Sequence, residues 1–219
     1  MSTELIEFIR YSSTGSILIP LVVGLVNYRN LVKMQKLLLF LVAAALLADI
    51  FALTLYKFKL ISYNIVVYNF YTLIAFNLLW FIYKESIPKL RNLATLIIQI
   101  AINLFGVVNF IFIEKWNSFN SNLMVATSIS FLFLAVFSFR QILQQIQYTR
   151  LEKSPIFWIN TGVIIYYSGT LILFLLSNQI NSISKSANNL HLAVWALNSV
   201  FNIILMSAYS FALWQKAAK

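Results

Sequence analysis

Long apolar runs separated by short polar connections dominate the chain. Each run is continuous rather than alternating, which favours helices over the ten-residue alternating strands of a membrane barrel. At 1.5 Å per helical residue, about 20 residues cross a hydrocarbon core of about 30 Å. The pattern predicts an all-α polytopic membrane protein. We expect one seven-helix transmembrane domain over residues 1–219, with spans at about 4–27, 37–56, 64–83, 93–113, 123–143, 155–178 and 190–214.

The first span is the least obvious of the seven. Its fully apolar part, residues 15–27, reaches only about 20 Å as a helix. We therefore expect the helix to begin near Glu4, which places the small polar run Ser12–Ser16 inside the bilayer. The alternative is a break at Gly15, with residues 5–11 lying on the membrane surface.

Polar residues recur at helical spacing within several spans, so each set lies on one face of its helix. In the fourth span they are Thr95, Gln99, Asn103, Gly106 and Asn109, and in the seventh His191, Trp195, Asn198, Asn202 and Tyr209. Shorter sets are Asp49 with Tyr56, Asn69 with Thr72, and Asn160 with Tyr167 and Asn178. Such stripes either hold helices together, at about 0.6 kcal/mol per contact, or converge on a polar cavity. Gly162 and Gly169, seven residues apart, predict a close-packing face.

Asp49 is the acidic residue that stands deepest in an apolar run. A charge in the membrane interior costs at least about 2.5–3.5 kcal/mol and therefore needs a partner or a wet cavity. Asp49 and Arg10 both fall roughly 9–10 Å below the same membrane surface, counted along neighbouring spans. We expect them to pair, with Asn69, Asn198 or Tyr167 hydrogen-bonded nearby.

Other arrangements of these charges stay open. Asp49 would be protonated and bonded to neutral partners, Arg10 would extend outward to the interface, or His191 at the mouth would reach Asp49. The Asp49–Arg10 pair would also serve a purely structural role by locking the first two spans together.

Composition and charge agree with a membrane protein, and the distribution of charge predicts the orientation of the chain in the membrane. The chain is 61% hydrophobic and 10% charged, against roughly 25% charged in soluble domains. The net charge of +10 comes from Lys and Arg in the short connections, which indicates topology and anionic-lipid contacts rather than nucleic acid. Eleven of these residues lie on one side and five on the other, which predicts an outside N-terminus and a cytoplasmic C-terminus.

The residue types present exclude several chemistries. Cysteine is absent, His191 is the single histidine, no HExxH motif occurs, and one membrane carboxylate does not make an aspartyl dyad. We expect neither metal nor cofactor, and on these grounds a protein without catalytic activity is favoured over an enzyme; an intramembrane hydrolase is the least favoured function. Lysines of the last span lie only at its cytoplasmic end, which excludes retinal attachment at mid-membrane.

The favoured function is a receptor-like ligand-binding protein, or a subunit of a membrane complex, with an outward-facing polar pocket. The alternative is a small-solute or proton-coupled transporter that uses Asp49, although few Gly or Pro interrupt the spans. A lipid-like or small molecule and a second membrane or cytoplasmic protein are the expected partners. Candidate ligand-binding residues are Asp49, Arg10, Asn69, Asn103, Tyr167, His191, Asn198 and Asn202.

Two segments carry a resemblance to a known group. The stretch LEKSPIFWINTGVIIYYSG at 151–169, and NYRN at 27–30 followed by the Asp-bearing second span, resemble a group of uncharacterised seven-span bacterial inner-membrane proteins. The resemblance implies seven spans in a bacterial cytoplasmic membrane and names no reaction. Where that group carries an acidic residue in its third span, this chain has Ala75 and Phe76.

Overall fold

The computed structural model describes residues 3–58, 65–114, 118–144, 150–183 and 188–215, with side chains described except at 3, 56, 176–183 and 188–193. This part of the chain is helical throughout, without a strand. Its α-helices are α1 (Thr3–Ser16), α2 (Leu18–Val26), α3 (Lys33–Lys57), α4 (Ile65–Ser86), α5 (Leu93–Val108), α6 (Ser121–Gln144), α7 (Pro155–Ile183) and α8 (Asn188–Trp214). Short helical turns are η1 (Tyr28–Asn30), η2 (Pro88–Leu90) and η4 (Leu151–Lys153), and η3 (Asn109–Ile113) is a π-helical end of α5. Seven helices, with α1 and α2 forming one of them, are long and apolar enough to cross a membrane, which confirms the predicted fold class.

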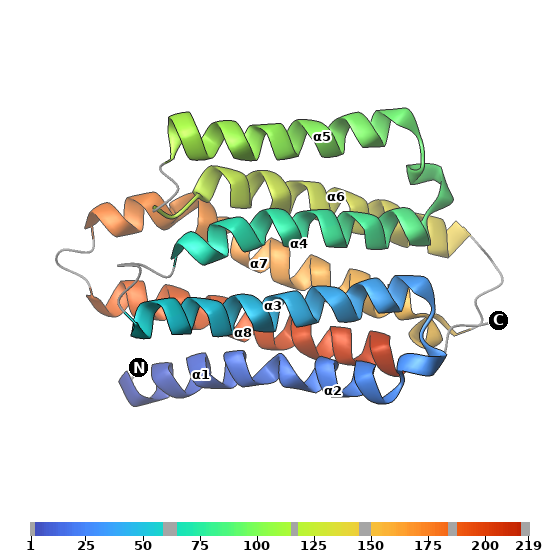
Figure 1. The fold of residues 1–219 in the computed structure, drawn as a ribbon, viewed down its shortest axis with the longest axis horizontal. Coiled ribbons are helices and arrows are strands. Elements are labelled where there is room, and N and C mark those ends of the chain that lie inside the picture. Colours follow the sequence, from blue (N-terminus) through green and yellow to red (C-terminus); the bar gives the residue numbers. More distant parts are fainter. Residues whose placement is uncertain (1–2, 59–64, 115–117, 145–149, 184–187, 216–219) are drawn as a thin grey trace.

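The first span is helical from Thr3 onward and is interrupted at Ile17, between α1 and α2. Pro20 has no N–H to donate to the carbonyl of Ser16, so the regular bonding pattern fails at this point. The neighbouring bonds, from Ile17 N to the Thr14 carbonyl and from Leu21 N to the Ile17 carbonyl, are long at 3.4 Å each. In Figure 1, α2 continues in the direction of α1. The early start near Glu4 agrees with a single span of Glu4–Val26, and the interruption lies at Ile17, two residues beyond the Gly15 break of the alternative.

The helices lie side by side along one long axis (Figure 1). Helix α8 packs against α7, α1, α2 and α3, while α4 packs against α3, α5 and α6. Helix α5 is the outermost and contacts only α4 and α6 closely among the described helices. We call the end where α1 begins and α3 ends the N-terminal end of the bundle, and the end where α8 finishes the C-terminal end.

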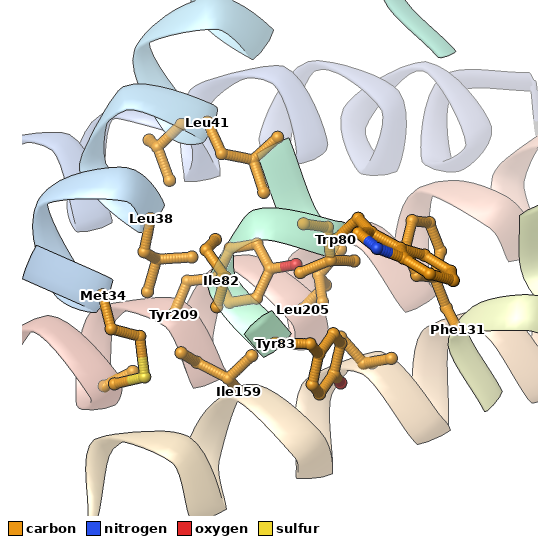
Figure 2. Close-up of a cluster of buried hydrophobic side chains, with 14 of the residues drawn as sticks. Met34, Leu38, Leu41, Trp80, Ile82, Tyr83, Phe131, Ile159, Leu205 and Tyr209 are labelled. Atoms are coloured by element: carbon orange, nitrogen blue, oxygen red, sulfur yellow. The ribbon is translucent and has the colours of Figure 1, made fainter. Parts of the chain in front are cut away.

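A dense apolar core is centred in the half of the bundle toward the C-terminal end, and Figure 2 shows part of it. Leu38 of α3, Ile82 and Tyr83 of α4, and Ile159 of α7 are completely buried there. The predicted close-packing face of α7 is also present. A Cβ added at Gly162 would stand 2.8 Å from the Ala208 Cβ of α8, and one at Gly169 would run into the ring of Phe201. Glycine at both positions therefore lets α7 and α8 approach closely.

Helix α5 is built with its polar residues inward and its apolar residues outward. Gln99 and Gly106 are buried, as is Asn109 in η3. Large apolar side chains are exposed along the other face, at Leu93, Ile97, Ile100, Leu104, Val107, Ile111 and Phe112. This arrangement is typical of a helix whose outer face contacts lipid rather than water.

Candidate ligand-binding site

A cavity of about 870 Å³ lies in the half of the bundle toward the N-terminal end, between α1, α3, α4, α6, α7 and α8. Leu79, Leu205 and Tyr209, which belong to the apolar core, form its floor. Its wall is rich in aromatic side chains: Tyr71, Phe119, Phe131, Tyr166, Tyr167, Phe174 and Trp195 line it. The polar groups that reach it include Arg10, Ser13, Asp49, Tyr68, Asn198 and Asn202. Small-molecule pockets have this volume range, a mainly apolar lining and a few placed polar groups.

Asp49 stands in the wall of the cavity, two turns before the end of α3. Its side chain is half-buried, and the hydroxyl of Tyr68 on the adjacent α4 donates a hydrogen bond of 2.9 Å to its Oδ1. Because α3 and α4 pack along their lengths, this bond ties the two helices together at the cavity.

The predicted ion pair between Asp49 and Arg10 is not formed. Within the described part of the chain, no Lys or Arg nitrogen lies within 4.0 Å of Asp49. Arg10 lines the same cavity but is exposed. The reason lies in helix packing: α1 packs along α8, and close packing of the first span on α3 is made by α2. Equal depth in the membrane therefore did not make the two residues neighbours.

The polar stripe of α8 faces the cavity from Trp195 to Tyr209, as its spacing predicted. The Nδ2 of Asn202 donates a hydrogen bond of 3.0 Å to the Ser13 hydroxyl of α1. The Oδ1 of Asn198 is buried and has no hydrogen-bond partner in the described part of the chain. His191, at the start of the same stripe, has its side chain outside the described residues.

Tyr167 projects from α7 into the aromatic wall. Its ring centroid lies 5.0 Å from that of Phe131 and 4.9 Å from that of Tyr166. Of the eight candidate residues, the structure thus brings Arg10, Asp49, Tyr167, Asn198 and Asn202 to one cavity.

Asn69 and Asn103 lie elsewhere, in contacts between elements. Asn69 is buried and donates a hydrogen bond of 2.7 Å to the carbonyl of Ser118. Asn103 joins Asn77 of α4 and Gln99 of α5 in an amide cluster. Gln99 and Asn103 of the polar stripe in the fourth span therefore hold α5 to α4, the plainer of the two roles predicted for the stripe.

The sequence analysis did not identify two residues that belong to these sites. Tyr68 holds Asp49, and Asn77 is the centre of the amide cluster. The signal for Tyr68 is its position one turn before Thr72 on the same helix face, whereas nothing in the sequence pairs Asn77 with Asn103. The described residues hold no group of three His, Cys, Asp or Glu side chains placed to bind a metal ion.

No protein-family model matches the chain, and neither a curated protein nor a solved structure is significantly similar to it. The seven apolar helices and the lipid-type surface of α5 nevertheless place it in a broad class. The chain is a multi-pass integral membrane protein that is embedded in a lipid bilayer.

Proposed function

We propose that this protein is a receptor-like ligand-binding membrane protein, or the ligand-binding subunit of a membrane complex, without catalytic activity of its own. The observation that carries the proposal is the cavity of about 870 Å³, with aromatic walls and a few polar groups. A bundle that needed only stability would fill this volume with side chains, because empty or wet space costs packing energy.

The same proposal includes an orientation and a location. The excess of Lys and Arg at the C-terminal end supports a cytoplasmic position for that end. The cavity then faces outward, with the N-terminus outside. The resemblance of the 151–169 segment to bacterial inner-membrane proteins supports the bacterial cytoplasmic membrane as the location.

A protein of this kind needs a partner to pass on a binding event. The connections at the C-terminal end are short, and the described ones are basic at Arg29, Lys89 and Arg91. Lys33 and Arg91 bind Glu85 at 2.9 and 3.4 Å, so this end has a defined surface. A second membrane protein or a cytoplasmic protein is the proposed recipient of the signal.

Transport is the second candidate, and Asp49 is the observation that favours it. Its carboxylate faces a cavity and accepts a hydrogen bond from neutral Tyr68, without a described cation within 4.0 Å. Carboxylates in such settings act as proton relays in transporters. Proton or solute uptake into proteoliposomes, lost on Asp49→Asn, would favour this function over a receptor. Hydrolysis is the weakest candidate, since His191 is the single histidine.

The experiment for the ligand-binding proposal is to fill the cavity. Ala75 lines it from α4, whereas Ala101 lies on the exposed face of α5. We would extract the protein in native-lipid nanodiscs and identify small molecules released from it by mass spectrometry. A molecule enriched with the wild type and with Ala101→Phe, but lost with Ala75→Phe, is the expected result. The same molecules in all three samples, each with an intact melting transition, would overturn the proposal.

A further inference from the structure

Two opposite charges share the cavity without neutralising each other. Asp49 enters it from α3 and Arg10 from α1, and no ion pair within 4.0 Å joins them. Burying a charge within a membrane protein is costly, so an unpaired carboxylate in a cavity wall calls for a compensating group. Water provides part of that compensation, and a ligand that carries both charges would provide it for both residues.

Asp49, on the α3 side of the cavity, suits an ammonium group. Its carboxylate keeps one oxygen beyond the bond from Tyr68. A primary ammonium has three N–H donors and no acceptor. Aromatic rings in the same wall, such as Tyr71 and Trp195, attract cations through their negative faces.

The other side of the cavity suits an anion and an apolar body. Arg10 is exposed at the rim, where its guanidinium offers a planar fork to a carboxylate or phosphate. Apart from the hydroxyl of Tyr209, the floor of Leu79, Leu205 and Tyr209 offers apolar contact to the remainder of the ligand.

From these groups we infer that the cavity binds a zwitterionic amphipathic molecule. This inference rests on the proposed ligand-binding function. Its ammonium group lies against Asp49, its anionic group lies toward Arg10, and its apolar part lies on the aromatic and aliphatic residues of the cavity. Two sources share this chemistry: the ethanolamine headgroup of a phospholipid and a free hydrophobic amino acid.

The test compares ligands that differ in one charge at a time. Lysophosphatidylethanolamine supplies both charges, its N-acetylated form lacks the ammonium, and an ethanolamine ether of equal chain length lacks the phosphate. Free phenylalanine and tryptophan represent the second source. Affinity for the full chain, purified in dodecyl maltoside, would be measured by native mass spectrometry and by the shift in melting temperature.

We expect the zwitterion to bind at least tenfold more tightly than its N-acetylated form, as a charge-assisted hydrogen bond requires. Asp49→Asn should reduce this preference to below twofold, while Glu7→Gln, an exposed carboxylate change on α1 outside the cavity, should keep it. Arg10→Gln should weaken the preference for the phosphate about two- to fivefold, because Arg10 is exposed. Lys57→Gln, also exposed, is its matched control.

The ligand series on the wild type keeps the test decisive if Asp49→Asn does not fold. Tyr68→Phe adds a variant that leaves the carboxylate in place and should keep at least a fivefold ammonium preference. Equal binding of zwitterionic and N-acetylated forms, both lost with Ala75→Phe, would overturn this inference and leave the proposed function standing. Failure of every probe to bind would overturn this inference alone, because the released-molecule experiment still decides the proposed function. Binding unaffected by Ala75→Phe would place the ligand outside the cavity and would overturn both. Preference for the lysolipid or for the amino acids identifies the source, and either one supports the inference.

Discussion

The cavity and the α4–α5 interface place the same kinds of side chain in opposite situations. At the interface, the Nδ2 of Asn77 donates to Asn103 Oδ1 at 2.7 Å, and Asn103 Nδ2 donates back to Asn77 Oδ1 at 3.2 Å. Gln99 adds a donor to Asn77 Oδ1 at 2.9 Å. In the cavity, by contrast, the buried Oδ1 of Asn198 has no partner in the described part of the chain.

The difference shows what decides between adhesion and binding in a membrane bundle. Lipid is as apolar as leucine, so an outer helix such as α5 gains little from apolar contact with its neighbours. Hydrogen bonds between amides therefore hold α5 in place, and every amide that does so meets a partner. Asn198 lies beside the cavity, where no described residue offers its Oδ1 a donor.

The largest effect should come from breaking the satisfied interface. Asn77→Leu removes three amide–amide hydrogen bonds and leaves Gln99 and Asn103 to find other partners, which should lower the free energy of unfolding by about 2 kcal/mol. Steric-trapping or SDS-unfolding measurements in micelles would check it. The lipid-exposed change Leu104→Ala is the control and should stay within about 0.5 kcal/mol. Equal effects of both substitutions would contradict the distinction between the two regions.

A double substitution sharpens this result. Asn77→Leu with Asn103→Leu removes both members of the reciprocal pair, so no unsatisfied amide remains between them. The double variant should cost less than the sum of the two single variants, with a coupling of about 0.5–1.5 kcal/mol in a double-mutant cycle. Strict additivity would show that the two amides act independently.

An intermediate effect is expected where the cavity meets a helix pair. Tyr68→Phe removes the 2.9 Å bond to Asp49, but water in the cavity can replace the lost donor. The free energy of unfolding should fall by about 0.5–1 kcal/mol, measured as above. A loss as large as that of Asn77→Leu would mean that Asp49 is structurally part of the packed bundle and does not face a wet site.

The smallest effect on stability should come from the cavity amide itself. Asn198→Leu removes an acceptor that the described residues leave unused and adds apolar volume, so stability should change by less than about 0.5 kcal/mol or increase. The matched ligand measurement should change lysophosphatidylethanolamine affinity by less than about twofold, because the buried Oδ1 does not face the open volume. Destabilisation by more than about 1 kcal/mol would show that Asn198 contributes to helix packing.

Hydrophobic patterning predicted the seven spans because lipid imposes a continuous apolar length on each of them. Two predicted starts were late: α3 begins at Lys33 rather than near 37, and α6 at Ser121 rather than near 123. Polar and basic residues at helix ends remain helical while their side chains reach the interface, so hydropathy alone places the ends too far inward.

The cavity could be predicted only in part. Helical periodicity identified the residues that share a face of α8, and those from Trp195 to Tyr209 do face one cavity. It could not identify which helix each face meets. The Asp49–Arg10 pair failed for that reason, since depth along a span says nothing about whether α1 or α2 packs on α3. Tyr68, the partner that Asp49 does have, depends on the register between α3 and α4, which is a tertiary property.

The interruption at Ile17 has a mechanical consequence for the cavity. It separates α2, which packs against both α3 and α8, from α1, which packs closely against α8. A rod with one backbone bond missing bends most easily at that bond, and here the bend point coincides with the edge of the cavity. A molecule that passes between the cavity and the surrounding lipid would therefore displace α1 by bending the first span at Ile17. The packed core would keep its position.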